Sequence, residues 1–317
     1  MKILITGGAG FIGSHLADHL ILKKKIKKII IIDNVKDGST RNLKNCINSK
    51  KVKFYKRDIK DLKKIKNLFR GIDLVFHLAA LSDVVPSIEK PIDYLNTNIM
   101  GTVNVLESMR IYNVKKIVYS ASSSCYGIPR KYPTNETDVI DPKYPYAFSK
   151  NLGEQTIAHW AKIYKINFVS LRLFNVYGTR SRTNTAYGAA LGVFLKQKLS
   201  NHPFTIIGDG KQKRDFIHVN DVVRAMYSST KNSVKNEIIN IGSGNPRSIL
   251  DLVGILKGRK ILIPKRPGEP DITHANIKKA VSKLRWRPKI SLEQGLNSVL
   301  KNILYWKNAP LWTKSKI

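Results

Sequence analysis

The stretch ITGGAGFIGSHL, residues 5–16, places four glycines directly after an apolar strand pattern and directly before a helical one. Gly7, Gly10 and Gly13 give the spacing GxxGxxG, and Gly8 with the last two also gives GxGxxG. Glycines at these positions permit a tight turn, a close approach of the backbone to a pyrophosphate, and close packing of the helix on the sheet. The positive N-terminus of the helix then points at the phosphates. This segment predicts a dinucleotide-binding strand, turn and helix.

The acidic residue that such a site needs follows at the expected distance. Asp33 ends the second apolar run, KIIIIDN, 20 residues after Gly13, which makes the glycine pattern far more specific. Its carboxylate can accept hydrogen bonds from both ribose hydroxyls of an adenosine and would repel a 2′-phosphate. The sequence therefore favours NAD over NADP as the cofactor.

Apolar runs rich in Ile and Val alternate with amphipathic stretches along the first 240 residues. Strands are predicted at 2–6, 28–34, 52–56, 73–79, 115–121, 168–174 and 237–242, and helices at 12–23, 62–69, 91–112, 147–164 and 221–229. Continuous apolar strands alternating with helices are typical of a parallel sheet covered on both faces. We expect an α/β fold with a doubly wound parallel sheet of the Rossmann type.

The regular alternation stops after Gly178 and returns only briefly. Residues 1–178 with 214–242 are predicted to form the NAD-binding domain. Residues 179–213 with 243–317 are predicted to form a smaller mixed α/β substrate domain, built from discontinuous segments. The two domains should meet at a cleft.

The bulk composition sets limits on partners and location. The formal charge of +34 raises nucleic acid as a partner, but the lysines are scattered between apolar positions, which favours a solvated lysine-rich surface and no nucleic acid. No apolar run reaches the roughly 20 residues needed to cross a bilayer. Two distant cysteines, Cys46 and Cys125, suggest a reducing compartment without disulfides or metal spacing. We expect a cytoplasmic protein.

The segment PYAFSK, residues 145–150, places Tyr146 and Lys150 on one face of a predicted helix. A tyrosine is a poor base at neutral pH unless a nearby ammonium group or nicotinamide cation lowers its pKa. A serine cluster, YSASSSCYG at 119–127, ends the strand before that helix and can relay the proton. These residues predict a catalytic acid/base site. His77 and His218 are expected to be structural.

Taken together, TGGAGFIGSH, HLAA, NTNIMGTVNVLE, SASSSCYG, YAFSK, LRLFNVYG, GDGKQKRDFIHVNDV, NIGSG, KRPGEPD and LRWRP resemble the extended short-chain dehydrogenases/reductases that act as nucleotide-sugar epimerases and dehydratases. The resemblance covers nearly the whole chain. It implies a triad of Ser122, Tyr146 and Lys150. It also implies a homodimer through helices near 96–112 and 146–164, whose extra apolar positions include Ile99, Val103, Ile157 and Trp160.

The same resemblance implies the binding residues. Those for NAD are, besides the triad's Tyr146 and Lys150, Gly7, Gly10, Phe11, Ile12, Gly13, Asp33, Asn34, Asp58, Ile59, Leu78, Ala79, Ala80 and Asn98. Those for the nucleotide sugar are Ser123, Ser124, Asn175, Phe204, Ile206, Arg214, Arg266, Glu269 and Thr273. Phe204 and Ile206 are expected to flank the base, and Arg214 and Arg266 to bind the pyrophosphate.

The reaction that the resemblance implies is 4-epimerisation. Family dehydratases carry an Asp-Glu pair after the active-site hydroxyl, and this chain has Ser123 and Ser124 there. The Tyr146 phenolate would remove the proton of the 4-hydroxyl while hydride passes from carbon 4 to NAD, and the keto sugar would turn over and take the hydride back. Thr273, small where hexose-only epimerases have an aromatic, leaves room for an N-acetyl group. The substrate would thus be a UDP-hexose or UDP-N-acetylhexosamine. Alternatives are a dehydratase, a reductase or a UDP-glucuronate epimerase of the same family, and, outside catalysis, an NAD-sensing or RNA-binding relative.

Overall fold

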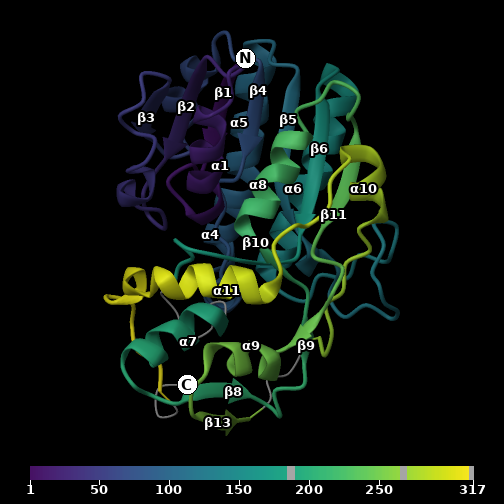
Figure 1. Cartoon of the computed structure of the whole chain (residues 1–317). Coiled ribbons are helices and arrows are strands. Elements are labelled where there is room, and N and C mark those ends of the chain that lie inside the picture. The colour runs from purple at the N-terminus through teal and green to yellow at the C-terminus, as the bar shows by residue number, and fades with distance from the viewer. Residues whose placement is uncertain (184–189, 265–269, 314–317) are drawn as a thin grey trace.

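The central sheet explains most of the architecture. The computed structural model describes residues 1–183, 190–264 and 270–313. Seven parallel strands lie in the order β11-β6-β5-β4-β1-β2-β3 (Figure 1). Their bounds are β1 Lys2–Thr6, β2 Lys28–Asp33, β3 Val52–Lys56, β4 Leu74–His77, β5 Lys116–Ser122, β6 Asn167–Leu173 and β11 Glu237–Ile241. These bounds lie within two residues of the predicted ones, and the doubly wound α/β fold is confirmed.

The strands are apolar along their whole length because helices cover both faces of the sheet. On one face lie α1 (Phe11–Ile21), α8 (Val219–Ser228) and α10 (Lys278–Leu284), which contribute Leu16, Val222 and Leu284 to one core cluster. On the other face lie α5 (Gly101–Ile111) and α6 (Pro145–Tyr164). Each face therefore buries its own apolar core.

The strand order places a switch point between β1 and β4. Thr6 at the end of β1 pairs with Ile32 of β2 on one side and with His77 of β4 on the other. From β2 the sheet continues to β3 in one direction, and from β4 it continues to β5 in the opposite direction. In such sheets a ligand binds in the crevice outside the carboxyl ends of the strands at this point. The glycine turn follows β1 directly, so it lies at the crevice.

The small lobe hangs below the carboxyl ends of the strands (Figure 1). It contains α7 (Ala190–Leu199), α9 (Ile249–Leu256), α11 (Leu292–Lys301) and the strand pair β8 (Phe204–Ile207) and β13 (Lys260–Ile263). Short pairs join it to the large lobe: β7 (Asn175–Tyr177) with β10 (Phe216–His218), and β9 (Lys213–Arg214) with β12 (Arg247–Ser248). A separate apolar cluster centred on Phe194, Phe204 and Leu296 holds this lobe together.

One segment departs from the predicted division into domains. Ala280 and Leu284 of α10, with Trp286 behind it, pack into the core of the large lobe, and Trp286 donates a hydrogen bond to the Asp221 carbonyl at 3.0 Å. Residues 278–286 were predicted to belong to the substrate domain. The amphipathic helix instead covers β11 and α8, because the end of the sheet needs an apolar cover (Figure 1).

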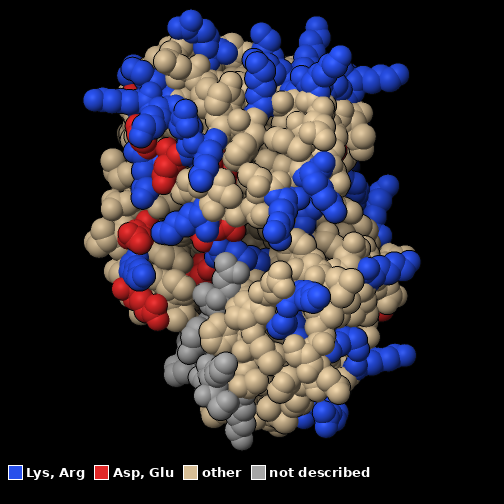
Figure 2. Space-filling view, turned by 90° about the vertical axis from the view of Figure 1, so that its left-hand side faces the viewer, with Lys and Arg blue, Asp and Glu red and all other residues tan. Residues whose placement is uncertain are grey.

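On the face drawn in Figure 2, the basic residues do not gather in one stripe. Figure 2 shows lysine and arginine side chains spread over both lobes, with carboxylates between them near the hollow that separates the lobes. In the described part of the chain, no helix is both long and apolar enough to span a bilayer.

Candidate active site

A single cavity of about 610 Å³ runs between the two lobes and brings most of the predicted site residues together. The predicted residues that line it are Gly7, Gly10, Phe11, Ile12, Gly13, Asp33, Asn34, Asp58, Ile59, Leu78, Ala79, Ala80, Ser122, Tyr146, Lys150, Asn175 and Arg214. These residues come from the carboxyl ends of β1 to β5, from the first turns of α1 and α6, and from β7 and β9. The same cavity is therefore lined by both the glycine turn and the helix that carries Tyr146 and Lys150.

The glycine turn has no space for side chains. Gly7 has a φ of +71°, and a Cβ there would lie 2.6 Å from the Ala79 backbone nitrogen. A Cβ on Gly13 would lie 2.2 Å from the Gly7 carbonyl oxygen. Helix α1 begins at Phe11, and its N-cap residue is Gly10, which has no side chain that could cap the helix. The first N–H groups of α1 therefore have no side-chain cap, and the residues that carry them line the cavity. This arrangement fits a pyrophosphate.

Asp33 ends β2 at the other side of this turn. Its carboxylate accepts hydrogen bonds from the backbone N–H groups of Ala9 at 2.9 Å and Val35 at 2.8 Å. Burial raises its pKa, while these backbone hydrogen bonds lower it. The carboxylate is thereby fixed in orientation at the cavity wall, where an adenosine ribose of a dinucleotide fits.

Asn98 supports the cavity wall from behind. It is almost fully buried, and it does not line the cavity as predicted. Its side chain accepts from the Leu81 backbone N–H at 2.8 Å and donates to the Leu81 carbonyl at 3.0 Å and to the Ser149 hydroxyl at 2.9 Å. It lies in a π-helical turn, Asn96–Met100. Asn98 thus ties the loop after β4 to the catalytic helix.

Tyr146, the predicted acid/base residue, lies next to the serine cluster at the end of β5. Tyr146 is in the first turn of α6, and its phenol hydrogen-bonds with Ser122 at the end of β5. Burial raises the pKa of Tyr146, the bond to Ser122 lowers it, and the charge of Asp83 raises it. The pKa of Tyr146 is therefore raised in the chain alone, and the group that lowers it is Ser122 rather than the predicted neighbouring ammonium of Lys150.

Lys150 lies one helical turn beyond Tyr146 and is 4% exposed. Desolvation lowers its pKa to about 7, and the charge of Glu154 acts in the opposite direction. Its amine is held above the ring of Tyr119, at 4.2 Å from the ring centroid. Lys150 and Tyr146 both line the cavity, so the two residues can act on one ligand.

The small lobe adds polar groups at the far end of the cavity. Arg214 of β9 and Asn175 of β7 line it. Thr273 donates a hydrogen bond to the Asn175 side chain at 2.9 Å and accepts one from the Asp215 backbone N–H at 3.0 Å. Thr273 therefore orients Asn175, although its own side chain does not line the cavity.

Two predicted base contacts are corrected by the strand that carries them. Phe204 and Ile206 point into the core of the small lobe and are almost fully buried. Side chains alternate along a strand, so their neighbours Thr205 and Ile207 line the cavity instead. The prediction that Phe204 and Ile206 flank a base is wrong in side-chain direction.

The remaining predicted substrate residues lie elsewhere. Ser123 and Ser124 are in a short 3₁₀ turn after β5 and do not line the cavity. Ser124 supports Ser122, because the two hydroxyl oxygens are 2.8 Å apart and the Ser124 backbone N–H donates to Ser122 at 3.2 Å. Arg266 and Glu269 lie outside the described residues.

Arg182 is a cavity residue that sequence reasoning missed. It follows β7, contacts the carboxylate of Asp37 after β2, and donates to Asp83 after β4 at 2.6 Å. Its guanidinium therefore crosses the cavity wall between two loops of the large lobe. The segment GTRSRTN contains two arginines, Arg180 and Arg182, two residues apart. No local sequence pattern indicates which of them lines the cavity.

The two histidines considered in the sequence have structural roles. His77 is fully buried between the hydroxyls of Thr6 at 2.7 Å and Thr102 at 2.8 Å, and burial lowers its pKa to about 3. His218 accepts from the Asn220 backbone N–H at 3.2 Å at the start of α8, and burial lowers its pKa to about 4. Both are neutral at pH 7.

Comparison with known proteins identifies relatives over nearly the whole chain. A family model described as GDP-mannose 4,6 dehydratase matches residues 4–299. A putative UDP-glucose 4-epimerase of Methanocaldococcus jannaschii is 38% identical, over 94% of this chain and 97% of that protein. The solved UDP-glucose 4-epimerase of Thermotoga maritima, with UDP-glucose, is 33% identical with a TM-score of 0.89, over 97% and 99% of the two chains. The UDP-glucuronic acid 4-epimerase of Bacillus cereus, solved with UDP-glucuronic acid and NAD, is 34% identical with a TM-score of 0.88, also over 97% and 99%.

Proposed function

The chain belongs to the extended short-chain dehydrogenase/reductase family of nucleotide-sugar epimerases and dehydratases, and on that premise we propose that it is an NAD-dependent 4-epimerase of a nucleotide sugar. The observation that carries this proposal is the meeting of two sites in one cavity. The glycine turn with Asp33 lines one region of the cavity, and Tyr146, Ser122 and Lys150 line another. A dinucleotide and a sugar can therefore lie against each other there.

The roles of the chain's own residues follow from their positions. Tyr146 accepts the proton of the sugar 4-hydroxyl and later returns it, acting as base and then as acid. Ser122, hydrogen-bonded to the phenol, orients that proton. The Lys150 amine lies on the same helical face as Tyr146, and in its protonated form it stabilises the phenolate. Each role is a proposal for this chain.

The residues at the turn fit NAD as the cofactor. The N-terminus of α1 and the crowded glycines suit a pyrophosphate, and Asp33 suits a ribose with a free 2′-hydroxyl. When bound, oxidised NAD supplies a hydride acceptor and a positive ring charge. Because burial alone leaves the pKa of Tyr146 raised, the phenol needs that positive charge to act as a base.

The distribution of carboxylates supports epimerisation over dehydration. The carboxylates among the described residues that line the cavity are Asp33, Asp37 and Asp58: Asp33 ends β2, Asp37 follows β2 and Asp58 follows β3, on the side of the glycine turn. The turn after β5 carries Ser123 and Ser124. An acid that could protonate a leaving hydroxyl at the catalytic end is thus missing from the described lining.

A UDP-sugar is the substrate that the relatives support best. Relatives have been solved with UDP-glucose and with UDP-glucuronic acid bound. Arg214 at the far end of the cavity suits a pyrophosphate. Thr273 holds the Asn175 side chain and does not itself line the cavity; that a small residue at this position leaves room for an N-acetyl group is what the family resemblance implies. We therefore infer that UDP-hexoses and UDP-N-acetylhexosamines are accepted.

Substitution of the phenol tests the catalytic assignment. Tyr146→Phe should lower the rate of 4-epimerisation by about a thousandfold, since general acid–base catalysis contributes about 10² to 10⁴. The measurement is NMR of purified protein, without added cofactor, against a panel of UDP-sugars. Tyr55→Phe makes the same chemical change in β3, at a residue that does not line the cavity, and serves as a control. If Tyr146→Phe stays within a few-fold of the wild-type rate, or if a keto or deoxy sugar accumulates with the wild type, the proposal is wrong.

A homodimer through α5 and α6 is also part of the proposal. Met100, Ile111, Phe148 and Ile163 are each about half exposed near or on these helices. Ile157, which the sequence suggested for the same surface, is fully buried within the chain and belongs to its core. Light scattering of wild type and Ile163→Glu should give a dimer and a monomer respectively. A cytoplasmic location remains a prediction.

A further inference from the structure

The side chain of Lys150 is enclosed by buried groups, called its seat below, that have no part in the proposed function. Its side chain is 4% exposed, so its charge is removed from water. A buried ammonium needs compensating groups to remain protonated. The groups that surround it decide how much of the amine carries a proton near neutral pH, and these groups can be named.

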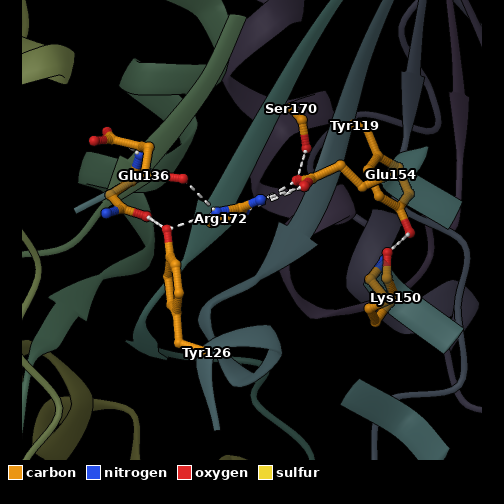
Figure 3. Close-up of polar contacts among 8 residues, drawn as sticks. Tyr119, Tyr126, Glu136, Lys150, Glu154, Ser170 and Arg172 are labelled. Atoms are coloured by element: carbon orange, nitrogen blue, oxygen red, sulfur yellow. Dashed lines mark hydrogen bonds and ion pairs between the residues drawn. The ribbon is translucent and has the colours of Figure 1, made fainter. Parts of the chain in front are cut away.

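Tyr119 of β5 forms the floor of this seat. The Lys150 amine lies 4.2 Å from the centroid of its ring, which is the geometry of a cation–π contact. Its hydroxyl donates a longer hydrogen bond of 3.3 Å to the Lys150 carbonyl (Figure 3). Gly153 makes room for it, because a Cβ at that position would lie 2.6 Å from the Tyr119 hydroxyl oxygen. The helix is thus built around this ring.

Glu154 supplies a negative charge one turn further along the same face of α6. It is 4% exposed and forms a buried ion pair with Arg172 of β6 at 2.6 Å. Ser170 donates to its other oxygen at 2.6 Å. Figure 3 shows the carboxylate between the arginine and Tyr119.

Arg172 is itself held on its far side. It donates to the Tyr126 hydroxyl at 2.9 Å and to the Glu136 carbonyl at 3.0 Å (Figure 3). Tyr126 then donates to Asn240 of β11 at 2.7 Å. Every member of this network has a partner, so the carboxylate of Glu154 is fixed in place.

We propose that Tyr119 and Glu154 are positioning residues for the reaction: the ring of Tyr119 seats the Lys150 amine, and Glu154, anchored by Arg172, keeps it charged. This inference rests on the proposed role of Lys150. The other titratable groups near the amine are Tyr146 on the same helix and His77 on β4, whose pKa is lowered by burial and by Lys150. His77 is neutral at pH 7, so Glu154 is the anionic partner among these neighbours.

The first experiment compares two substitutions at one position. Tyr119→Phe keeps the ring and loses the hydroxyl, whereas Tyr119→Leu removes the aromatic face. Selective ¹⁵N labelling of lysine, with Lys150→Met to assign the signal, gives the pKa of Lys150 in the holoenzyme without any substrate. We expect the pKa to fall by about one unit in Tyr119→Leu, a tenfold change in the protonation equilibrium, and to stay within a few tenths of a unit in Tyr119→Phe.

The second experiment removes the charge of Glu154. Glu154→Gln should also lower the pKa of Lys150, and Glu293→Gln, which alters a surface pair with Arg247, should leave it unchanged. Should Glu154→Gln fail to fold because Arg172 loses its partner, the double variant Glu154→Gln/Arg172→Met tests the same charge. In each affected variant the alkaline limb of the kcat profile should move to lower pH by about one unit, with KM within twofold.

The outcomes separate this inference from the proposed function. A Lys150 pKa that is unchanged in Tyr119→Leu and in both Glu154 variants overturns the inference, whatever the enzyme does. If the pKa of Lys150 falls equally in Tyr119→Phe and Tyr119→Leu, the effect belongs to the hydroxyl, and the proposed role of the ring is wrong. A shifted pKa with no epimerisation in the wild type supports the seat and contradicts the proposed function alone.

Discussion

At the scale of the residue, burial is the strongest influence on the ionisable groups of the cavity. Desolvation lowers the pKa of Lys150 to about 7 and raises that of Tyr146. Both shifts disfavour the charged form, so burial alone makes a phenolate at Tyr146 and an ammonium at Lys150 costly. In the proposed mechanism, a Tyr146 phenolate beside a Lys150 ammonium therefore depends on the positive charge of oxidised NAD and on the groups that surround Lys150.

His77 gives a pH-dependent stability that can be measured apart from activity. Its pKa is about 3 in the folded chain and about 6.5 in an unfolded one. The unfolded state therefore binds the proton first, and stability falls as pH drops from 6.5 towards 3, by on the order of 5 kcal/mol in total. His77→Gln removes this titration while keeping groups that can bond Thr6 and Thr102. Urea unfolding at pH 7 and 4.5 should show a smaller loss of stability in the variant.

The other buried histidines titrate in both proteins, so the difference between the two pH dependences isolates His77. The variant will be less stable at pH 7, because an amide does not fill the space of an imidazole. Equal losses between pH 7 and 4.5 in variant and wild type would contradict the assignment.

Which residues were predictable follows from how local their signals are. Gly13, Asp33, Tyr146 and Lys150 stand at fixed positions relative to a strand end or a helix start, so spacing alone placed them in the cavity. Arg182 has no such marker, because it reaches the cavity only through the path of the loop after β7 and through Asp37 and Asp83.

At the scale of the element, the glycine turn and α9 contain glycines with opposite consequences. A Cβ at Gly13 would lie 2.2 Å from a backbone oxygen, whereas a Cβ at Gly254 in α9 would meet nothing within 4 Å. Gly13→Ala should destabilise the chain by about 1 to 3 kcal/mol through overpacking and should weaken NAD binding. Gly254→Ala should stabilise it by about 0.5 to 1 kcal/mol, because alanine favours a helix interior.

Thermal unfolding of both variants, with cofactor content measured after gel filtration, checks this pair. Gly254→Ala should retain as much cofactor as the wild type. A Gly13→Ala protein with wild-type stability and cofactor content would mean that the turn is not packed as described.

The elements themselves were predictable because the strands are buried on both faces and read as continuous apolar runs. The direction of single side chains was harder to predict. In β8, all four residues FTII are compatible with burial, and only the contact with α7 and α9 decides that Phe204 and Ile206 face the lobe's core. Helix α10 likewise joined the large lobe through long-range packing, which no local period specifies.

At the scale of the whole molecule, the segment after β7 holds the two lobes together over the cavity. The His15 ring nitrogen lies 2.9 Å from the Thr179 carbonyl oxygen, Arg180 pairs with Asp18 at 2.7 Å, and Trp306 donates to the Ser181 carbonyl at 3.0 Å. Arg182 completes the segment by joining two loops of the large lobe. A dinucleotide in the cavity could leave only if some of these contacts opened.

Arg182→Met should therefore speed the release of NAD. The substitution removes charged hydrogen bonds worth about 1.5 to 3 kcal/mol each, so loss of one such contact predicts release about 10 to 100 times faster. It also leaves Asp83 without its cation, and because the charge of Asp83 raises the pKa of Tyr146, the acid limb of the kcat profile should move to higher pH. Arg130→Met, at an exposed position, is the matched control.

Release is measured by diluting holoenzyme into a trap that consumes free NAD and following the cofactor left on the protein. The double variant Asp83→Asn/Arg182→Met should return the pH profile towards the wild type while NAD still leaves quickly, because the carboxylate is gone but the bridge is not rebuilt. If Arg182→Met holds NAD as long as the wild type does, the bridge does not control release. The retention of the cofactor would then depend on the turn and on Asp33 alone, and a stable holoenzyme would need no contact between the lobes.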